Sequence, residues 1–247
     1  MDKDQKIALL IDCDNASYQA IDGVLNELAK YGATNIRRAY GNWKARNLKG
    51  WEDQLHPFSI QPIQQFAYTQ GKNATDAAMI IDAMDLLYTQ KLDGFALMTS
   101  DSDFTPLAMR ILTNGLKVYG FGEKKTPLPF VNACSQFIFT ENLTATIEVG
   151  DKPADVPHDL KKSRTELRAD TALVKLLRNA SEQTAEEDGW SDLARVGQYI
   201  NNNASFSPIN YGYKKLSDLI AASGLYQVEM RKNNSVMYIK DNRNKAA

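Results

Sequence analysis

The chain has 247 residues, of which 24% are charged and 43% are hydrophobic, and its formal net charge is −1. These proportions are ordinary for a folded globular protein, so they exclude wholesale disorder. The length allows one large domain or two modest ones. A net charge this close to zero neither favours nor excludes a nucleic-acid partner.

The two cysteines, Cys13 and Cys134, lie far apart and form no CxxC pair, and the chain has only two histidines. This excludes a disulfide framework, a zinc knuckle and a histidine-rich metal site. The first residues, MDKDQK, are charged, and no apolar run approaches the ~18 residues that span a bilayer. We therefore expect a cytoplasmic protein without a membrane partner, while the oligomeric state is left unknown.

In the first part of the chain, strand patterns alternate with helix patterns. The strands are expected at 6–11, 35–40, 59–68, 94–99, 116–121 and 136–139, and the helices at 17–30, 74–88 and 104–112. Such alternation is typical of βαβ units. The sequence therefore predicts an α/β domain over residues 1–146, with a Rossmann-like parallel sheet flanked by helices.

The expected helix at 74–88 has apolar residues on most of its faces, including Ala77, Met79, Ile81 and Leu87. A helix that is apolar all round is usually buried on all sides. We therefore expect it to be largely buried.

The composition changes after this domain. Residues 147–165 contain two prolines and many charges with little apolar periodicity, which favours a flexible linker. Residues 166–247 then predict helices at 169–185, 193–202 and 214–223 and two strands at 227–231 and 236–240. Asn233 and Asn234 lie between these strands, and asparagine tolerates the positive φ of hairpin turns. This order predicts a small winged-helix α+β domain.

Acidic residues follow two of the expected strands directly. Asp12 and Asp14 come after the first strand, Asp101 and Asp103 come after the fourth, and Asp76 lies early in the helix at 74–88. Strands of an open parallel sheet end along one edge, and ligands bind there at the topological switch point. Carboxylates gathered at such an edge repel one another unless a cation offsets them. Hard divalent ions prefer oxygen ligands, so the sequence predicts a Mg²⁺ or Mn²⁺ site.

Each acid also has a local explanation. Asp14 suits an Asx-turn, Asp76 suits the dipole at the start of a helix, and Ser102 or Asp103 suits a helix N-cap. The joint occurrence of two acidic pairs at strand ends and one early helical aspartate favours the metal site. Asp82 and Asp85 lie on other sides of the helix from Asp76, so they should point elsewhere.

The segments LLIDCDNA, KNATDAAMIIDAM and ALMTSDSDF resemble those of the NYN domain, a branch of the PIN-like nucleases, over about residues 5–142. The resemblance, which fits the LabA-like bacterial group, implies a Rossmann-like fold and an acidic, Mg²⁺-dependent ribonuclease centre. It implies that Asp12, Asp76 and Asp101 are the core acidic residues. Asp103 would be a further ligand or would position a water, and Asn15 would be a polar partner of Asp12.

Residues 36–51, IRRAYGNWKARNLKGW, interleave basic and aromatic side chains. Single-stranded nucleic acid is held by cations that contact phosphates and by rings that stack on bases. We expect RNA, single-stranded or structured, to contact residues drawn from this stretch and from the mouth of the acidic crevice, namely Arg38, Trp43, Lys44, Arg46 and Lys72. The alternative is a solvated basic surface whose aromatic rings pack inward.

The segment 173–239 resembles the OST-HTH (LOTUS) domain, through GWSDLARVGQYINN and YGYKKLSDLIAASGLYQV. This resemblance implies a winged helix that binds RNA or a protein partner.

Three functions are compatible with these patterns. The first is a metal-dependent ribonuclease with a C-terminal binding module. The second is a non-catalytic RNA-binding adaptor with the same fold. The third is a haloacid-dehalogenase-like phosphatase, because IDCDN resembles the nucleophile loop of that family, although the acidic helix is then unexplained.

Overall fold

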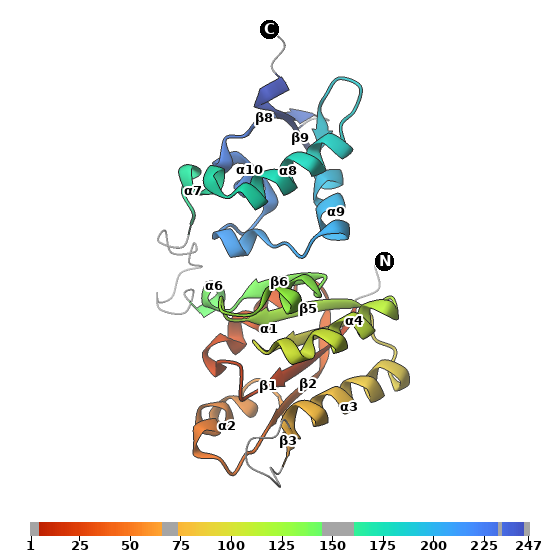
Figure 1. The fold of residues 1–247 in the computed structure, drawn as a ribbon, viewed down its shortest axis with the longest axis vertical. Coiled ribbons are helices and arrows are strands. Elements are labelled where there is room, and N and C mark those ends of the chain that lie inside the picture. Colours follow the sequence, from red (N-terminus) through yellow and green to blue (C-terminus); the bar gives the residue numbers. More distant parts are fainter. Residues whose placement is uncertain (1–4, 66–73, 145–160, 232–233, 245–247) are drawn as a thin grey trace. The chain divides into compact units, whose positions relative to one another are not determined.

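The computed structural model describes residues 5–65, 74–144, 161–231 and 234–244 (Figure 1). The chain forms two compact units, Met1–Ile147 and Glu148–Ala247. Lys72, the end of the predicted third strand at 66–68 and most of the predicted linker, 147–160, lie outside the described residues. In the parts of the chain that are described, no helix is long and apolar enough to cross a membrane.

The first unit contains a six-stranded sheet that is parallel throughout, with the strand order β3-β2-β1-β4-β5-β6. The strands are β1 (Lys6–Asp12), β2 (Ala33–Gly41), β3 (Gln61–Gln64), β4 (Gly94–Met98), β5 (Lys117–Gly122) and β6 (Gln136–Phe139). This confirms the predicted Rossmann-like sheet. The strand order reverses direction between β1 and β4, which is the topological switch point of such a fold.

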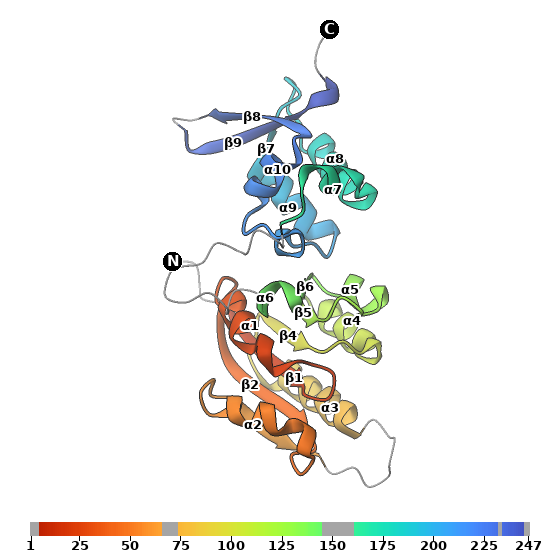
Figure 2. The same cartoon turned by 90° about the vertical axis from the view of Figure 1, so that its left-hand side faces the viewer.

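Helices cover both faces of this sheet. They are α1 (Ile21–Leu28), α2 (Lys49–Leu55), α3 (Ala74–Thr89), α4 (Thr105–Thr113), α5 (Leu128–Asn132) and α6 (Glu141–Thr144), with short 3-10 segments η1 (Tyr18–Ala20), η2 (Arg46–Leu48) and η3 (Ser102–Phe104). Figure 2 shows α1 and α2 on one face and α3, α4 and α5 on the other.

The side chains of β1 alternate between the two faces of the sheet, and this alternation determines the face on which Asp12 lies. Ala8 and Leu10 share a core with Met79 and Ala83 of α3. Side chains two residues apart in a strand point to the same face. Asp12 therefore lies on the face of the sheet that α3 covers.

The prediction that α3 is largely buried was wrong. Met79 and Ala83 are fully buried, but Ile81 is 63% exposed and Tyr88 is 60% exposed. The helix packs on the sheet with one face only, so apolar residues on its outer faces contact solvent. Composition alone did not distinguish this arrangement from a helix buried on all sides.

An ion pair and a hydrogen bond attach α3 to β2. The carboxylate of Asp82 accepts hydrogen bonds from Nη1 of Arg38 and from the hydroxyl of Tyr40. Arg38 and Asp82 are only about a quarter exposed, and Tyr40 is fully buried. Asp82 is thus paired with β2, and it is not among the acids that raise the pKa of Asp76. Arg38, predicted as an RNA contact, pairs with Asp82, and its contact with RNA stays a prediction.

Replacing Tyr40 with Phe should lower the free energy of unfolding by about 1–2 kcal/mol, because the buried carboxylate of Asp82 loses one donor. Urea unfolding of the full chain, followed by circular dichroism, measures this. The control is Tyr88→Phe, whose exposed hydroxyl accepts a hydrogen bond from Arg110, and it should change stability by less than about 0.5 kcal/mol. Equal effects of the two substitutions would contradict the role given to Asp82.

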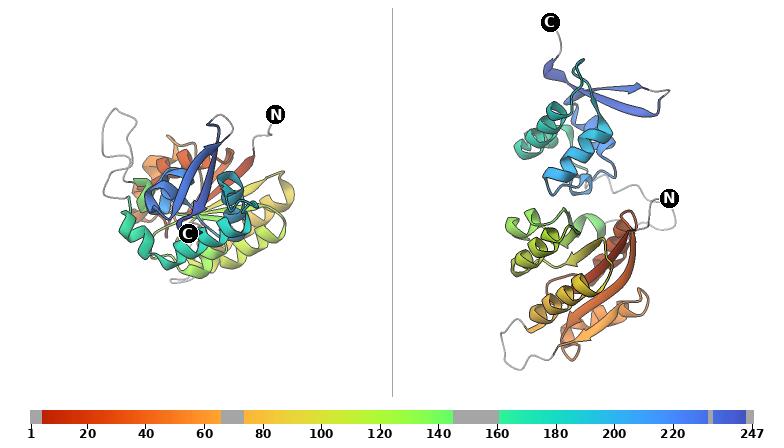
Figure 3. Two further views of the ribbon diagram at one scale, coloured as in Figure 1. Left: turned by 90° about the horizontal axis from the view of Figure 1, so that it is seen from above. Right: turned by 90° about the vertical axis from the view of Figure 1, so that its right-hand side faces the viewer.

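The second unit combines helices with a three-stranded antiparallel sheet of order β7-β9-β8. Its elements are α7 (Arg164–Ala169), α8 (Thr171–Gln183), β7 (Ser191–Asp192), α9 (Leu193–Asn203), η5 (Pro208–Tyr211), α10 (Leu216–Ser223), β8 (Tyr226–Arg231), β9 (Val236–Asp241) and η6 (Asn242–Asn244). The β8–β9 hairpin projects from the helices (Figure 3). Asn234 has a φ of 61°, as expected for the asparagine turn. This confirms the small winged-helix α+β domain.

Local capping explains where the start of this unit differs from the sequence prediction. The helix predicted at 169–185 is α8 and begins later, at Thr171, because Asp170 is extended and its side chain caps α8 at the amide of Leu173. Ser163 and Glu166 form a reciprocal capping box, so α7 begins at Arg164, inside the range assigned to the linker.

Candidate metal centre

The loops that follow β1 and β4 are hydrogen-bonded to each other at the switch point. Ile11 pairs with Met98 in the sheet, so the two strands end side by side. The amide of Ser100 donates to the carbonyl of Asn15 at 3.2 Å. The hydroxyl of Thr99 donates to Oδ2 of Asp12 at 2.7 Å. The sheet therefore brings the two acidic loops together at one edge.

Asp12 is fully buried, and donors surround its carboxylate. Oδ1 accepts the amide of Asp14 at 3.1 Å, while Oδ2 accepts the side-chain amide of Asn15 at 3.0 Å and the hydroxyl of Thr99. Burial raises the pKa of Asp12 above its ordinary value, although these hydrogen bonds oppose the shift. Asn15 is thus a partner of Asp12, as the family resemblance implies, and Asp12 rather than Asp14 forms the Asx-turn.

Asp101 occupies the matching position after β4. Its amide donates to the hydroxyl of Thr99 at 3.1 Å, and its Oδ1 accepts the amide of Asp103 at 2.9 Å. Asp101 therefore caps η3, where the sequence favoured Ser102 or Asp103 as the cap. Thr99 connects the two acids, because its hydroxyl donates to Asp12 and accepts from the backbone of Asp101.

Asp76 lies in the first turn of α3, and its side chain is half-buried. Its pKa is raised to about 6, first by burial and then by the negative charges of Asp12, Asp101, Asp103 and Asp14. This set contains every acid predicted at the two strand ends. The fold therefore brings five carboxylates from distant parts of the sequence within electrostatic range of one another.

These carboxylates do not form a closed cage. Among residues 5–65, 74–144, 161–231 and 234–244, no group of three or more His, Cys, Asp or Glu side chains is arranged to hold a metal ion. Electrostatic interaction reaches further than a metal–oxygen bond, so the two findings agree. The donor set still suits a hard divalent cation, because it consists of oxygen atoms and carries a concentration of negative charge that raises the pKa of Asp76.

Two contributors to this centre were missed or undervalued at the sequence level. Thr99 was treated only as part of a strand end, yet its buried hydroxyl joins Asp12 to Asp101. Asp14 is exposed and adds to the charge that acts on Asp76. A polar residue immediately after the apolar run at 95–98 was the available signal for Thr99.

The basic and aromatic stretch divides into structural and exposed residues. The backbone amide of Trp43 donates to Oε1 of Gln64 at 3.0 Å, and its indole N–H donates to the carbonyl of Ile63 at 3.0 Å. Trp43 thus helps to connect its loop to β3, which leaves it a weaker candidate for stacking on a base. Lys44 and Arg46 are exposed on the same stretch. The predicted RNA contact there now rests on these two cations.

Comparisons with known proteins agree with the geometry. The NYN domain model matches residues 6–144, which is more than half of the 247-residue chain. The chain belongs to the NYN domain family. NYN domains form a PIN-like nuclease family, which supports a nuclease-type fold and function in general terms. The OST-HTH/LOTUS domain model matches residues 168–238 of the second unit, and that domain type suggests RNA binding.

A search of curated proteins gives no match. Among solved structures, the chain is similar to a protein of unknown function from Vibrio parahaemolyticus RIMD 2210633, with 19% identity and a TM-score of 0.46. The similarity covers 56% of this chain and 94% of that chain. A likeness at this level gives no information on activity.

The raised pKa of Asp76 predicts that its charge opposes folding at neutral pH. An ordinary aspartate has a pKa near 3.8, whereas in the folded NYN domain Asp76 titrates at about 6. The penalty is therefore present at pH 7, falls as the pH drops through 6, and vanishes below 3.8. The shift corresponds to at most about 3 kcal/mol, and solvent screening at this half-exposed side chain reduces it to about 1 kcal/mol.

We expect Asp76→Asn to raise the free energy of unfolding by about 1 kcal/mol at pH 7 in EDTA, with a smaller difference at pH 4. Urea unfolding at both pH values tests this. The control is Asp85→Asn, since Asp85 is an exposed acid on the same helix. A variant at Asp76 that is less stable than the wild type at pH 7 would contradict the repulsion inferred here.

Proposed function

We propose that the NYN domain is a Mg²⁺- or Mn²⁺-dependent ribonuclease that hydrolyses RNA phosphodiester bonds at Asp12, Asp76, Asp101 and Asp103. The observation that carries this proposal is the joining of the two acidic loops at the switch point, where Thr99 connects Asp12 to Asp101. The raised pKa of Asp76, to which four other carboxylates contribute after burial, supports it. Perturbed titration at a sheet edge where ligands bind is typical of a functional centre. The family match supports the same chemistry.

Charge explains why such a centre needs a cation. A phosphodiester is an anion, so carboxylates alone would repel it. A bound divalent cation offsets the charge of the phosphate and of the leaving 3′ oxygen and lowers the pKa of an attacking water. In this proposal, Asp12, Asp76 and Asp101 hold the cation, and Asp103 is a further ligand or orients the water.

The chain's own hydrogen bonds prepare these groups. Thr99 and Asn15 fix both the position and the rotation of the Asp12 carboxylate. Asp101 uses Oδ1 for the cap of η3, so Oδ2 is the atom that we assign to the cation. The attachment of α3 to β2 through Asp82 sets the position of the helix that carries Asp76.

Two other functions are less well supported. A phosphatase of the haloacid-dehalogenase type would use Asp12 as a nucleophile, but it gives no role to Asp76, whose pKa is raised in part by the acids at the two strand ends. A non-catalytic RNA-binding adaptor would gain nothing from acids that repel both one another and RNA. In the ribonuclease proposed here, the LOTUS domain binds RNA or a protein partner and so supports the nuclease.

Asp101→Asn gives the sharpest test of catalysis. Asparagine caps helices as well as aspartate does, so the start of η3 should persist while the charge is lost. We expect cleavage of single-stranded and structured RNA in Mg²⁺ or Mn²⁺ to fall at least about 100-fold, a loss typical of a group that stabilises charge in the transition state. Wild-type protein in EDTA should be equally inactive.

The matched control for this test is Asp85→Asn, which should cleave at the wild-type rate. Thermal unfolding of each variant checks that the fold persists. Cleavage by Asp101→Asn at the wild-type rate would remove Asp101 from the mechanism, and equal cleavage in EDTA would point to a contaminant.

A second experiment tests the exposed cations Lys44 and Arg46. Each phosphate contact to a single strand contributes about 0.7 to the slope of log affinity against log salt. Replacing both residues with Ala should therefore weaken RNA binding in EDTA and reduce this slope by about 1.4. Lys91→Ala combined with Lys117→Ala removes two exposed cations that lie at the N-terminal ends of β4 and β5, away from the acidic strand ends. This variant should leave the slope unchanged. An unchanged slope in the Lys44 and Arg46 variant would make the stretch purely structural.

A further inference from the structure

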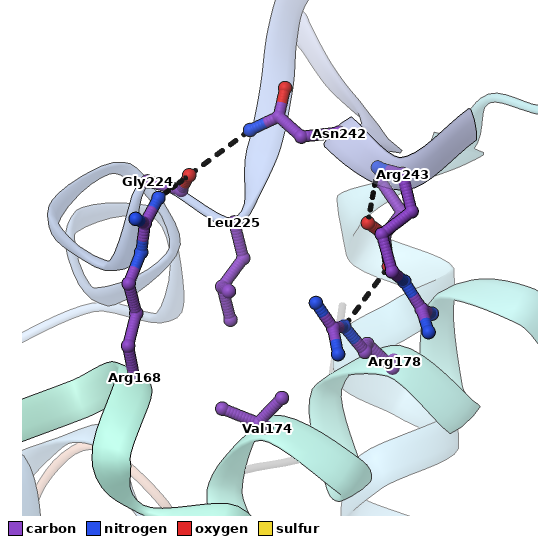
Figure 4. A pocket seen from close by; sticks show the side chains of 8 residues that line it. Arg168, Val174, Arg178, Gly224, Leu225, Asn242 and Arg243 are labelled. Carbon is purple, nitrogen blue, oxygen red and sulfur yellow. Dashed lines mark hydrogen bonds and ion pairs between the residues drawn. The ribbon is translucent and has the colours of Figure 1, made fainter. Parts of the chain in front are cut away.

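The LOTUS domain contains a pocket of about 410 Å³ that the sequence patterns did not indicate. Its walls come from α7, α8, the turn between α10 and β8, and the end of β9 with η6. Figure 4 shows Arg168, Arg178 and Arg243 around the opening and Val174 and Leu225 at its apolar side. The volume lies within the range of about 300–1,000 Å³ of small-ligand sites.

The pocket carries an excess of positive charge. Three arginines and one carboxylate, that of Asp241, line it. Asp241 accepts Nε of Arg243 at 3.0 Å and also lies 3.2 Å from Nε of Arg178, so one acid serves two guanidinium groups. Glu182, outside the lining, pairs with Arg243 at 3.1 Å. Counting both acids against the three arginines still leaves one positive charge.

Arg168 holds one side of the pocket in place. Its guanidinium donates to the carbonyls of Ser223 and Gly224 at the C-terminal end of α10. Asn242 donates to the same carbonyl of Gly224 at 3.0 Å. The rim is therefore preorganised by backbone contacts, which reduces the entropy lost when a ligand binds.

Arg178 is ion-paired on one side of its guanidinium group. Its buried Nε lies 3.2 Å from Oδ2 of Asp241, so this nitrogen already faces a carboxylate. Its two Nη nitrogens make no hydrogen bond to a described residue. In Figure 4 the guanidinium of Arg178 is turned toward the space beside Val174, so an acceptor in the pocket would meet these Nη nitrogens.

We propose that this pocket binds a nucleotide through its phosphate. Guanidinium groups match the geometry of phosphate oxygens and also stack on planar rings. The apolar side formed by Val174 and Leu225 suits the base or the ribose rather than a second charge. The nucleotide is either free or the 5′-phosphorylated end of an RNA strand, since both present the same chemistry. This site does not depend on catalysis by the NYN domain.

Isothermal titration calorimetry of the full chain in EDTA tests the proposal with AMP, adenosine, inorganic phosphate, and an RNA hexamer with a 5′-phosphate or a 5′-hydroxyl. We expect AMP to bind at least tenfold more tightly than adenosine or inorganic phosphate. We also expect the 5′-phosphate hexamer to bind more tightly than its 5′-hydroxyl form. A 5′-phosphate hexamer that binds at least tenfold more tightly than both AMP and its 5′-hydroxyl form would assign the pocket to RNA ends, and affinity equal to that of AMP would assign it to free nucleotides.

Arg178→Gln should weaken AMP binding at least tenfold. The matched control is Arg195→Gln, because Arg195 is an exposed arginine on α9 that pairs only loosely with Glu186, at 3.8 Å. It should change affinity less than twofold. In the wild type, the Nε–Hε NMR signal of Arg178 should shift on addition of AMP, which tests the site even if Arg178→Gln destabilises the domain.

Three outcomes would overturn the proposal. These are the absence of AMP binding together with equal affinity for the two hexamers, equal affinity for AMP and inorganic phosphate, and an Arg178 signal that does not move when AMP binds.

Discussion

The buried carboxylate of Asp12 is the constraint on which the first unit depends. A charge removed from water must be met by donors, and here the donors come from both loops of the switch point. Thr99 reaches Asp12 from the end of β4, while Asn15 and the amide of Asp14 reach it from its own loop. The hydrogen bonds that stabilise this carboxylate thus also fix the sheet edge at which the other acids gather.

The position of the acids followed from the sequence because strand ends in a parallel sheet share one edge, and this holds for Asp12 and Asp101 whatever the details of packing. Partnerships between distant side chains did not follow. The pairing of Arg38 with Asp82 spans 44 residues, and the indole of Trp43 bonds to a carbonyl 20 residues away. Such contacts depend on how α3 and the β2–α2 loop pack on the sheet, which periodicity does not encode.

The same distinction applies to the LOTUS domain. Three of its helices, α8, α9 and α10, and its hairpin followed from apolar spacing and from the tolerance of Asn234 for positive φ, whereas α7 did not. Its arginine-lined pocket did not, because Arg168, Arg178 and Arg243 are separated in the sequence and converge only through the packing of α7, α8 and the end of β9. The chain therefore has an acidic centre in its first unit and an arginine-lined pocket in its second. The pocket would attract a phosphate group directly, whereas the acidic centre would do so only with a bound cation.

Direct Mn²⁺ binding tests, without any substrate, whether the acids at the switch point share a divalent cation. Electron paramagnetic resonance of free Mn²⁺ at pH 7.5 should give saturable binding to the wild type. Asp76→Asn should weaken that binding at least tenfold, because it removes a negative charge that lies within electrostatic range of Asp12, Asp101 and Asp103. Identical Mn²⁺ affinity in the wild type and in this variant would contradict a cation shared by these acids.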